Sequence, residues 1–420
     1  MTLLDTPDRA DILDSSGPTT SGAGLESQIA YVLQNKEEHG YSPAIGKLFD
    51  LVLTYIDDAE DAVRKGQKAA WVMGLWEAPL FYACDTIPIS LAELGRLGSA
   101  EANTVAEDHF QIPKETCSMV TTLLGEWYLR RNSPVKRVVV YNGYCEPLNQ
   151  GWELIRSEGY EVHRIDGIAC PPDADADERR QEMARFLVGE FQKAARWLTG
   201  KPVDEARLAV EIRRANRILR KIRQIFDLRL KNPLYFRSLA TMCMLMGSAH
   251  YFGKPDEYEA VLDGLIDELQ TADFVPPKRG KIVPLAWFGA RGQEFGVYKA
   301  VDDAGGAIVG WYSSNPWLHD WREDLPPLEA VAEYWVNRTS MTSMDNRLRN
   351  LEKVIELSGA RGILQYTYVG CSYGGIYHEI QRDHFQAKGI PSMSLEGSFQ
   401  VGPPTGQLLT RVRAFVEMLS

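Results

Sequence analysis

The sequence has no apolar run long enough to cross a bilayer, so we expect no membrane-spanning helix. It has no excess of positive charge either, because 46 Lys and Arg stand against 57 Asp and Glu, for a formal net charge of −11. Nucleic-acid binding needs a basic face, so this balance disfavours a nucleic-acid partner. Residues 1–24 lack a basic start followed by an apolar core, and we expect a flexible arm there rather than a secretory signal.

Cysteine is scarce, with six residues, and no two of them form a CxxC pair. The standard zinc and ferredoxin motifs are therefore missing. Without a secretory signal, these cysteines indicate the cytoplasm, where thiols stay reduced and free to bind metals. A single cysteine is more often a small buried hydrophobe than a ligand, and we assign Cys84 and Cys243 to packing. Cys170 lies at the edge of a polar loop, where nothing favours a ligand role.

A chain of 420 residues is too long for one ordinary domain, and two or three are expected. Short β-branched runs alternate with helical patterns in two regions, which predicts parallel sheets with right-handed crossovers. The fold class that follows is α/β, with two doubly wound parallel-sheet (flavodoxin-like) domains and flanking helices. The expected divisions are a helical N-terminal segment at 25–65, a first α/β domain at 66–175, a helical connecting region at 176–275 and a second α/β domain at 276–420.

Three cysteines have neighbours that suit a metal site. Cys145 and Cys371 each follow a predicted strand, and ligands of open α/β sheets bind beyond the carboxyl ends of the strands. Cys117 begins a predicted helix, whose positive end stabilises a thiolate. Gly143 and Gly370 let the backbone approach a bulky group closely. Three converging thiolates, rather than four, would leave one position of a metal centre open for chemistry.

The chain from about Trp71 to its end resembles the family of 2-hydroxyacyl-CoA dehydratases and benzoyl-CoA reductases. The three cysteines stand in the order and in the contexts typical of that family. The segments that carry the resemblance are Glu77–Pro88, Glu115–Ser118, Val140–Glu146, Gly389–Gly397 and Gly406–Leu419.

The resemblance implies an iron–sulfur cluster of the 4Fe-4S type, held by Cys117, Cys145 and Cys371. Because hydrogen bonds to sulfur tune such a cluster, Ser118 and Ser372 are the expected donors to the sulfurs. It also implies a dimer with a related sister subunit or a second copy, and an ATP-dependent activator that delivers one electron at low potential. The expected reaction is the dehydration of a 2-hydroxyacyl-CoA thioester through a ketyl radical.

Other activities stay open at this point. Glu146 follows the second cysteine where many dehydratase subunits have aspartate, and the Ala83–Asp85 segment is closer to the benzoyl-CoA reductases. The alternatives are a subunit that reduces an aromatic acyl-CoA, a homodimer that shares a double-cubane 8Fe-9S cluster and reduces small molecules, and a partner subunit that carries electrons but binds no substrate. A zinc-binding or metal-free α/β protein is a further reading.

Four more side chains are candidates for the site. His378 and Glu379 follow Cys371 on a predicted helix and would relay protons, unless they are surface residues of that helix. Arg338 and Arg347 precede the last α/β unit and would pair with CoA phosphates, unless they make ordinary surface pairs.

Overall fold

The computed structural model confirms the α/β fold class, with two four-stranded sheets whose strands all run parallel. It describes residues 21–73, 78–90, 100–142, 145–167, 176–230, 235–271, 282–290, 296–312, 319–337, 343–398 and 404–420. Residues 1–20 of the predicted arm lie outside these ranges, and α2 (Ser21–Glu38) already begins within the rest of that arm. Cys170, Gly143 and Arg338 also lie outside the described residues.

The first sheet forms from the β-branched runs that the sequence marks as strands. Its strands are β1 (Lys68–Met73), β2 (Thr86–Ser90), β3 (Arg137–Asn142) and β4 (Glu161–Asp166), in the order β2-β1-β3-β4. The intervening helices are α4 (Ala78–Ala83), α5 (Ala100–Asp108), α6 (Ser118–Leu129) and α7 (Glu146–Ser157). β3 lies between β1 and β4, and Val138 to Val140 are fully buried.

The second sheet repeats this order as β6-β5-β7-β8. Its strands are β5 (Val283–Gly289), β6 (Gly306–Tyr312), β7 (Gly362–Tyr368) and β8 (Ser392–Gly397). Around it lie α12 (Gly296–Asp303), α14 (Met344–Ser358), α15 (Ser372–Ala387) and α16 (Gly406–Leu419), whereas α13 (Pro327–Val336) packs on α8 (Asp177–Thr199) and α9 (Glu205–Arg229). β6 and β7 are buried along their whole length, as expected for parallel strands covered by helices on both faces.

Both sheets have the strand order of flavodoxin-like folds, in which the chain reverses direction across the sheet between the first and third strands. In the first sheet this switch point lies between β1 and β3, and in the second between β5 and β7. Cys145 follows β3 and Cys371 follows β7. The two cysteines therefore occupy equivalent topological positions, where such folds bind ligands.

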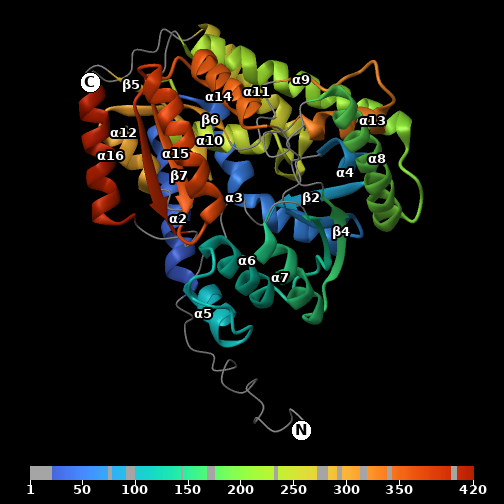
Figure 1. Ribbon diagram of the computed structural model, residues 1–420. Coiled ribbons are helices and arrows are strands. Elements are labelled where there is room, and N and C mark those ends of the chain that lie inside the picture. The colour runs from blue at the N-terminus through green and yellow to red at the C-terminus, as the bar shows by residue number, and fades with distance from the viewer. Residues whose placement is uncertain are drawn as a thin grey trace.

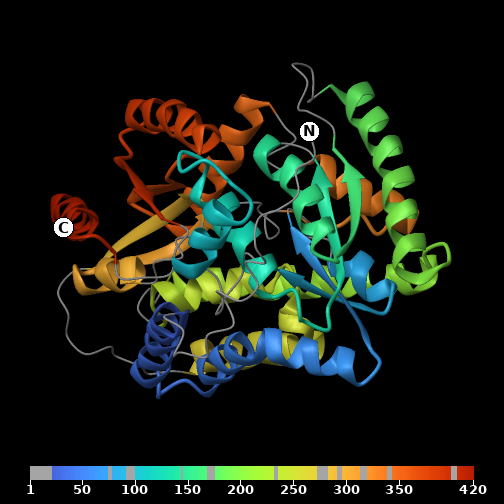
Figure 2. The same cartoon turned by 90° about the horizontal axis from the view of Figure 1, so that it is seen from below.

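Helices between and before the sheets join the two halves. They are α3 (Pro43–Arg64), α8 (Asp177–Thr199), α9 (Glu205–Arg229), α10 (Ser238–Gly247), the short η1 (Tyr251–Gly253) and α11 (Pro255–Thr271). α3 packs on β1, α10 and α11, while α10 packs on β6 (Figure 1). Figure 2 shows the two α/β units side by side, with the blue α3 and the yellow-green α9 on one side of them. Among the described residues, every helix is too short or too polar to cross a membrane.

The helical connecting region between the sheets holds α8 to α11, and the predicted domain boundaries themselves stay predictions. Two helices, α5 and α13, lie where the sequence patterns indicate no regular element. α7 begins at Glu146, directly after Cys145. Its start follows from Pro147 in the first turn, where proline's fixed backbone angle favours a helix and no N–H bond is lost.

Candidate metal centre

The three cysteines chosen from the sequence each precede a helix directly. Cys117 is the N-cap residue of α6, Cys145 that of α7 and Cys371 that of α15. The N–H groups of a first helical turn have no partner within the helix, and the helix dipole adds positive potential at that end. Each sulfur therefore stands where a negative charge is stabilised.

Cys117 and Cys371 are in direct contact, although they come from different sheets. The interaction of the two thiols lowers the pKa of Cys371 and raises that of Cys117. Burial opposes ionisation of both thiols. The backbone holds the pair together, because the Ser118 N–H donates to the Val369 carbonyl at 3.0 Å.

Gly370 makes this approach possible. Its φ of +79° is a left-handed conformation that favours glycine, and a Cβ there would stand 2.9 Å from the Glu115 carbonyl and 3.0 Å from the Cys117 backbone. From the sequence, we expect Gly370 to let the backbone approach a bulky bound group. In the structure, Gly370 also lets the loop after β7 approach the backbone of residues 115–117.

Cys145 lies at the switch point of the first sheet, directly after β3. It is partly buried, and burial raises the pKa of its thiol. The charge of Cys371 adds to this effect, which places the two sulfurs within electrostatic range of each other. That all three sulfurs converge on one centre stays a prediction.

The surroundings of the sulfurs fit a thiolate-bound metal centre. Backbone N–H groups of the first helical turns lower the pKa of all three thiols; they belong to Met119, Val120, Leu148, Tyr373 and Gly374. Hydrogen bonds to sulfur are a principal means of tuning iron–sulfur centres. Among the described residues, no three His, Cys, Asp or Glu side chains close on a single metal ion.

The hydroxyl of Thr367 was not predicted from the sequence as part of this site. It donates to the Cys371 sulfur and lowers the pKa of that thiol. Thr367 is nearly buried in β7, and Gly374 leaves room for it, since a Cβ at Gly374 would stand 2.3 Å from the hydroxyl oxygen. The available signal was its place near the carboxyl end of β7, shortly before Cys371 in the sequence.

The other side chains predicted for the site differ in how far they are exposed to solvent. His378 is buried in α15, and burial lowers the pKa of its imidazole to about 4, so the ring is neutral at pH 7. Glu379 is exposed and pairs with Arg382 at 2.6 Å. Ser372 is exposed at the start of α15, and Ser118 is partly buried at the start of α6. The roles of these four residues in the site stay predictions.

The remaining described cysteines lie in the hydrophobic core. Cys243 is fully buried in α10, and Cys84 follows α4 with 2% exposure. Burial raises the pKa of Cys84 to about 11. Its neighbour Asp85, in the segment with reductase-like character, forms a salt bridge to Arg207 at 2.5 Å. That carboxylate is thus engaged in holding α4 to α9.

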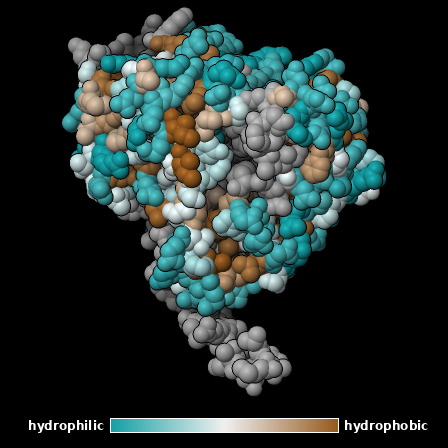
Figure 3. Space-filling model, in the orientation of Figure 1, coloured by the Kyte–Doolittle hydropathy of each residue, from teal (hydrophilic) through white to brown (hydrophobic). Residues whose placement is uncertain are grey.

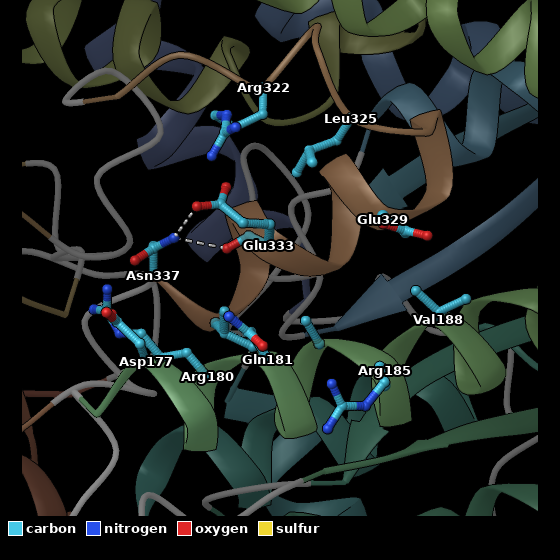
Figure 4. A pocket seen from close by; sticks show the side chains of 12 residues that line it. Asp177, Arg180, Gln181, Arg185, Val188, Arg322, Leu325, Glu329, Glu333 and Asn337 are labelled. Atoms are coloured by element: carbon cyan, nitrogen blue, oxygen red, sulfur yellow. Dashed lines mark hydrogen bonds between the residues drawn. The ribbon is translucent and has the colours of Figure 1, made fainter.

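A pocket of about 650 Å³ lies between α8 and α13 (Figure 4). Its size suits a small-molecule ligand, but its lining carries charges of both signs. Glu333 accepts a 2.7 Å hydrogen bond from Asn337, and burial raises the pKa of its carboxyl group. Arg322 is paired with Asp324. Because these groups already have partners, the pocket does not by itself select an anion or a cation.

The fold and site define a two-sheet α/β protein with thiols gathered at the carboxyl edges of both sheets. A family model described as 2-hydroxyglutaryl-CoA dehydratase, D-component, matches residues 78–419. The chain belongs to this family, and the resemblance stated from its motifs is confirmed. It is also 21% identical to "Putative dehydratase subunit YjiM" of Escherichia coli (strain K12) over 335 residues, which cover 77% of this chain and 85% of that protein.

Proposed function

We propose that this chain holds a 4Fe-4S cluster through Cys117, Cys145 and Cys371 and is the cluster-bearing subunit of a 2-hydroxyacyl-CoA dehydratase. The observation that carries the proposal is the meeting of Cys117 and Cys371, which are remote in sequence, at two helix N-termini. Membership of a dehydratase family supports the reaction class.

The bound cluster would supply an electron and an open coordination position for the thioester carbonyl oxygen. Held by Cys117, Cys145 and Cys371, such a cluster would supply the one-electron chemistry for loss of water from the thioester by way of a ketyl radical, with no net redox change. The protein's part is to hold the three thiolates, to direct N–H groups at the sulfurs and to limit the access of water. Burial of Cys117 serves the last of these tasks.

A partner would cover the side of the site formed by α15. Four apolar side chains near Cys371 are exposed: Val369 by 51%, Tyr373 by 36%, Ile376 by 65% and Ile380 by 42%. Tyr373, Ile376 and Ile380 recur at helical spacing and form one stripe, the α15 stripe. Figure 3 shows brown, hydrophobic atoms on the surface over α15. Contiguous exposed apolar surface is typical of protein interfaces. We assign this stripe to a related subunit or a second copy of the chain.

The low-potential electron would come from an ATP-dependent activator, and the cytoplasm supplies the reducing conditions that free thiols need. The test of the cluster is anaerobic reconstitution of the full chain, followed by iron and sulfide analysis. We expect a brown protein with about four irons per chain, and Cys117→Ser, Cys145→Ser and Cys371→Ser should each lose most of that iron. Cys84→Ser and Cys243→Ser are the matched controls, because both thiols lie in the core.

Iron-free wild-type protein after reconstitution would end the proposal, and so would full iron content in all three ligand variants. About eight irons per dimer agree with a 4Fe-4S cluster in each chain. A bridged cluster that is lost when the dimer is separated would instead favour the double-cubane reductase. Product analysis with activator separates dehydration of a 2-hydroxyacyl-CoA from reduction of an aromatic acyl-CoA, which is the second candidate because of the Ala83–Asp85 segment.

A further inference from the structure

Arg347 is a cation without an anionic partner beside the candidate metal centre. It lies in the first turn of α14, and its guanidinium stands over the ring of Tyr377 at 4.4 Å and toward that of Tyr312 at 5.8 Å. Its Nε is buried and has no hydrogen-bond partner, while the residue as a whole is partly exposed. Among the described residues, no carboxylate forms an ion pair with it.

The carboxylates on the adjoining helices are engaged elsewhere or point away. Glu352 of α14 pairs with His384 and Lys388, and Glu379 of α15 pairs with Arg382. Asp345 is two residues from Arg347 on the same helix, a spacing at which side chains do not face each other. Burial and the positive charge of Arg347 both lower the pKa of His378, so its imidazole is neutral at pH 7. Nothing described near the guanidinium compensates its charge except the two aromatic rings.

The place of Arg347 connects it to the metal centre. Tyr377 is on α15, less than two turns or about 9 Å along the helix axis from Cys371. Its ring meets that of Tyr373 at a centroid distance of 4.5 Å, and the N–H of Tyr373 faces the Cys371 sulfur. Tyr312 ends β6, so both rings that hold the guanidinium lie at the carboxyl edge of the second sheet.

We propose that Arg347 is the anchor for an oxyanion, a carboxylate or phosphate group, of the acyl-CoA ligand. A guanidinium presents a planar fork that binds such groups through two parallel hydrogen bonds. The two tyrosine rings fix its plane, and because the residue is partly exposed, an arriving anion can reach the guanidinium and pair with it. This inference rests on the proposed function, since it takes the ligand to be an acyl-CoA.

The test measures binding of acyl-CoA esters to the anaerobically reconstituted full chain by titration calorimetry, with iron content determined in the same samples. Glutaryl-CoA and pentanoyl-CoA have equal chain length and differ by a terminal carboxylate. We expect Arg347→Gln to weaken glutaryl-CoA binding about 10- to 100-fold without loss of iron. Arg349→Gln is the matched control, because Arg349 is exposed on the same helix.

The source of the oxyanion follows from the second ligand. Unchanged pentanoyl-CoA binding in Arg347→Gln identifies a carboxylate of the acyl group. Equal weakening of both esters identifies a CoA phosphate, and removal of the 3′-phosphate from the ester should then weaken the wild type to the level of the variant. A folded Arg347→Lys, which keeps the charge and loses the fork, should bind glutaryl-CoA several-fold more weakly.

Wild-type affinity for every ester in Arg347→Gln would overturn the inference and leave the cluster proposal intact. If Arg347→Gln does not fold, wild-type affinity in Arg347→Lys overturns it instead. An iron-loaded wild type that binds neither ester also overturns it. Iron-free wild-type protein points to failure of the proposed function itself.

Discussion

Gly370 joins the two halves of the candidate metal centre at the scale of a single residue. Its Cβ position is blocked by backbone atoms of residues 115–117, which cannot yield as a flexible side chain would. We expect Gly370→Ala to lower the free energy of unfolding by about 1–3 kcal/mol and to reduce iron uptake. Urea unfolding and iron analysis measure the two effects.

Gly389→Ala is the matched control, because Gly389 has a φ of +73° and no atom within 4 Å of its Cβ position. It shares the backbone strain but not the close approach to Cys117. Equal losses of stability and iron in the two variants would show that the contact between the loops contributes nothing.

His39 predicts a dependence of stability on pH. It is fully buried, its Nδ1–H donates to the Asn35 carbonyl, and its Nε2 accepts from the Arg237 N–H at 3.0 Å. The ring must be neutral to accept this bond, and burial lowers its pKa from 6.5 to about 4. Because the folded-state pKa lies below the unfolded value, the stabilisation is present above pH 6.5 and is lost as pH falls through about 4.

Neutral His39 contributes about 3 kcal/mol to the free energy of unfolding at neutral pH, since each unit of difference between its folded and unfolded pKa corresponds to about 1.36 kcal/mol. His39→Gln removes the titrating group, so the stability difference between wild type and variant should narrow as pH is lowered from 7.5 to 4.5. Urea midpoints at several pH values measure it. Parallel curves for the two proteins would contradict the assignment.

At the scale of elements, helix N-termini position the site and connect the chain around it. α9 begins at the N-cap Asp204, whose carboxylate accepts from the Arg207 N–H at 3.1 Å. Arg207 in turn pairs with Asp85 beside α4. The start of α9 therefore sets the contact between the helical layer and the first sheet.

Asp204→Ala should cost about 1 kcal/mol in the free energy of unfolding, the usual value of an N-cap. Asp204→Asn should lower the free energy of unfolding much less, because asparagine caps a helix nearly as well as aspartate does. Thermal unfolding with both variants checks this expectation. Similar losses in the two would mean that the charge, rather than the cap, stabilises α9.

At the scale of the whole molecule, the α15 stripe predicts association. Ile376→Arg should lower the mass in anaerobic light scattering toward that of a single chain of 47.2 kDa, because a charge cannot be buried in an apolar contact without a partner. Met418→Arg is the control, with 63% exposure on α16 against 65% for Ile376. A mass unaffected by Ile376→Arg would remove the stripe from the interface.

The sequence alone determined the buried strands, most of the helices and the candidate ligands, whereas α5 and α13 were not indicated by it. Strands with runs such as Val138–Val140 are recognisable because burial on both faces demands continuous apolar residues. Cys117, Cys145 and Cys371 stand out by their place at the junctions of strands, loops and helices. The family motifs lie in the same segments, so the fold class and the family were predictable from local pattern.

Only the tertiary structure decided which residues meet. Cys117 and Cys371 come together because the loop after β7 lies against residues 115–117, a contact that no local spacing encodes. Local spacing also does not encode the position of Thr367 at the Cys371 sulfur, or that of Arg347 near two tyrosine rings. Secondary structure follows from short-range periodicity, but a site made from both sheets depends on how their edges pack, which is a long-range property of the folded chain.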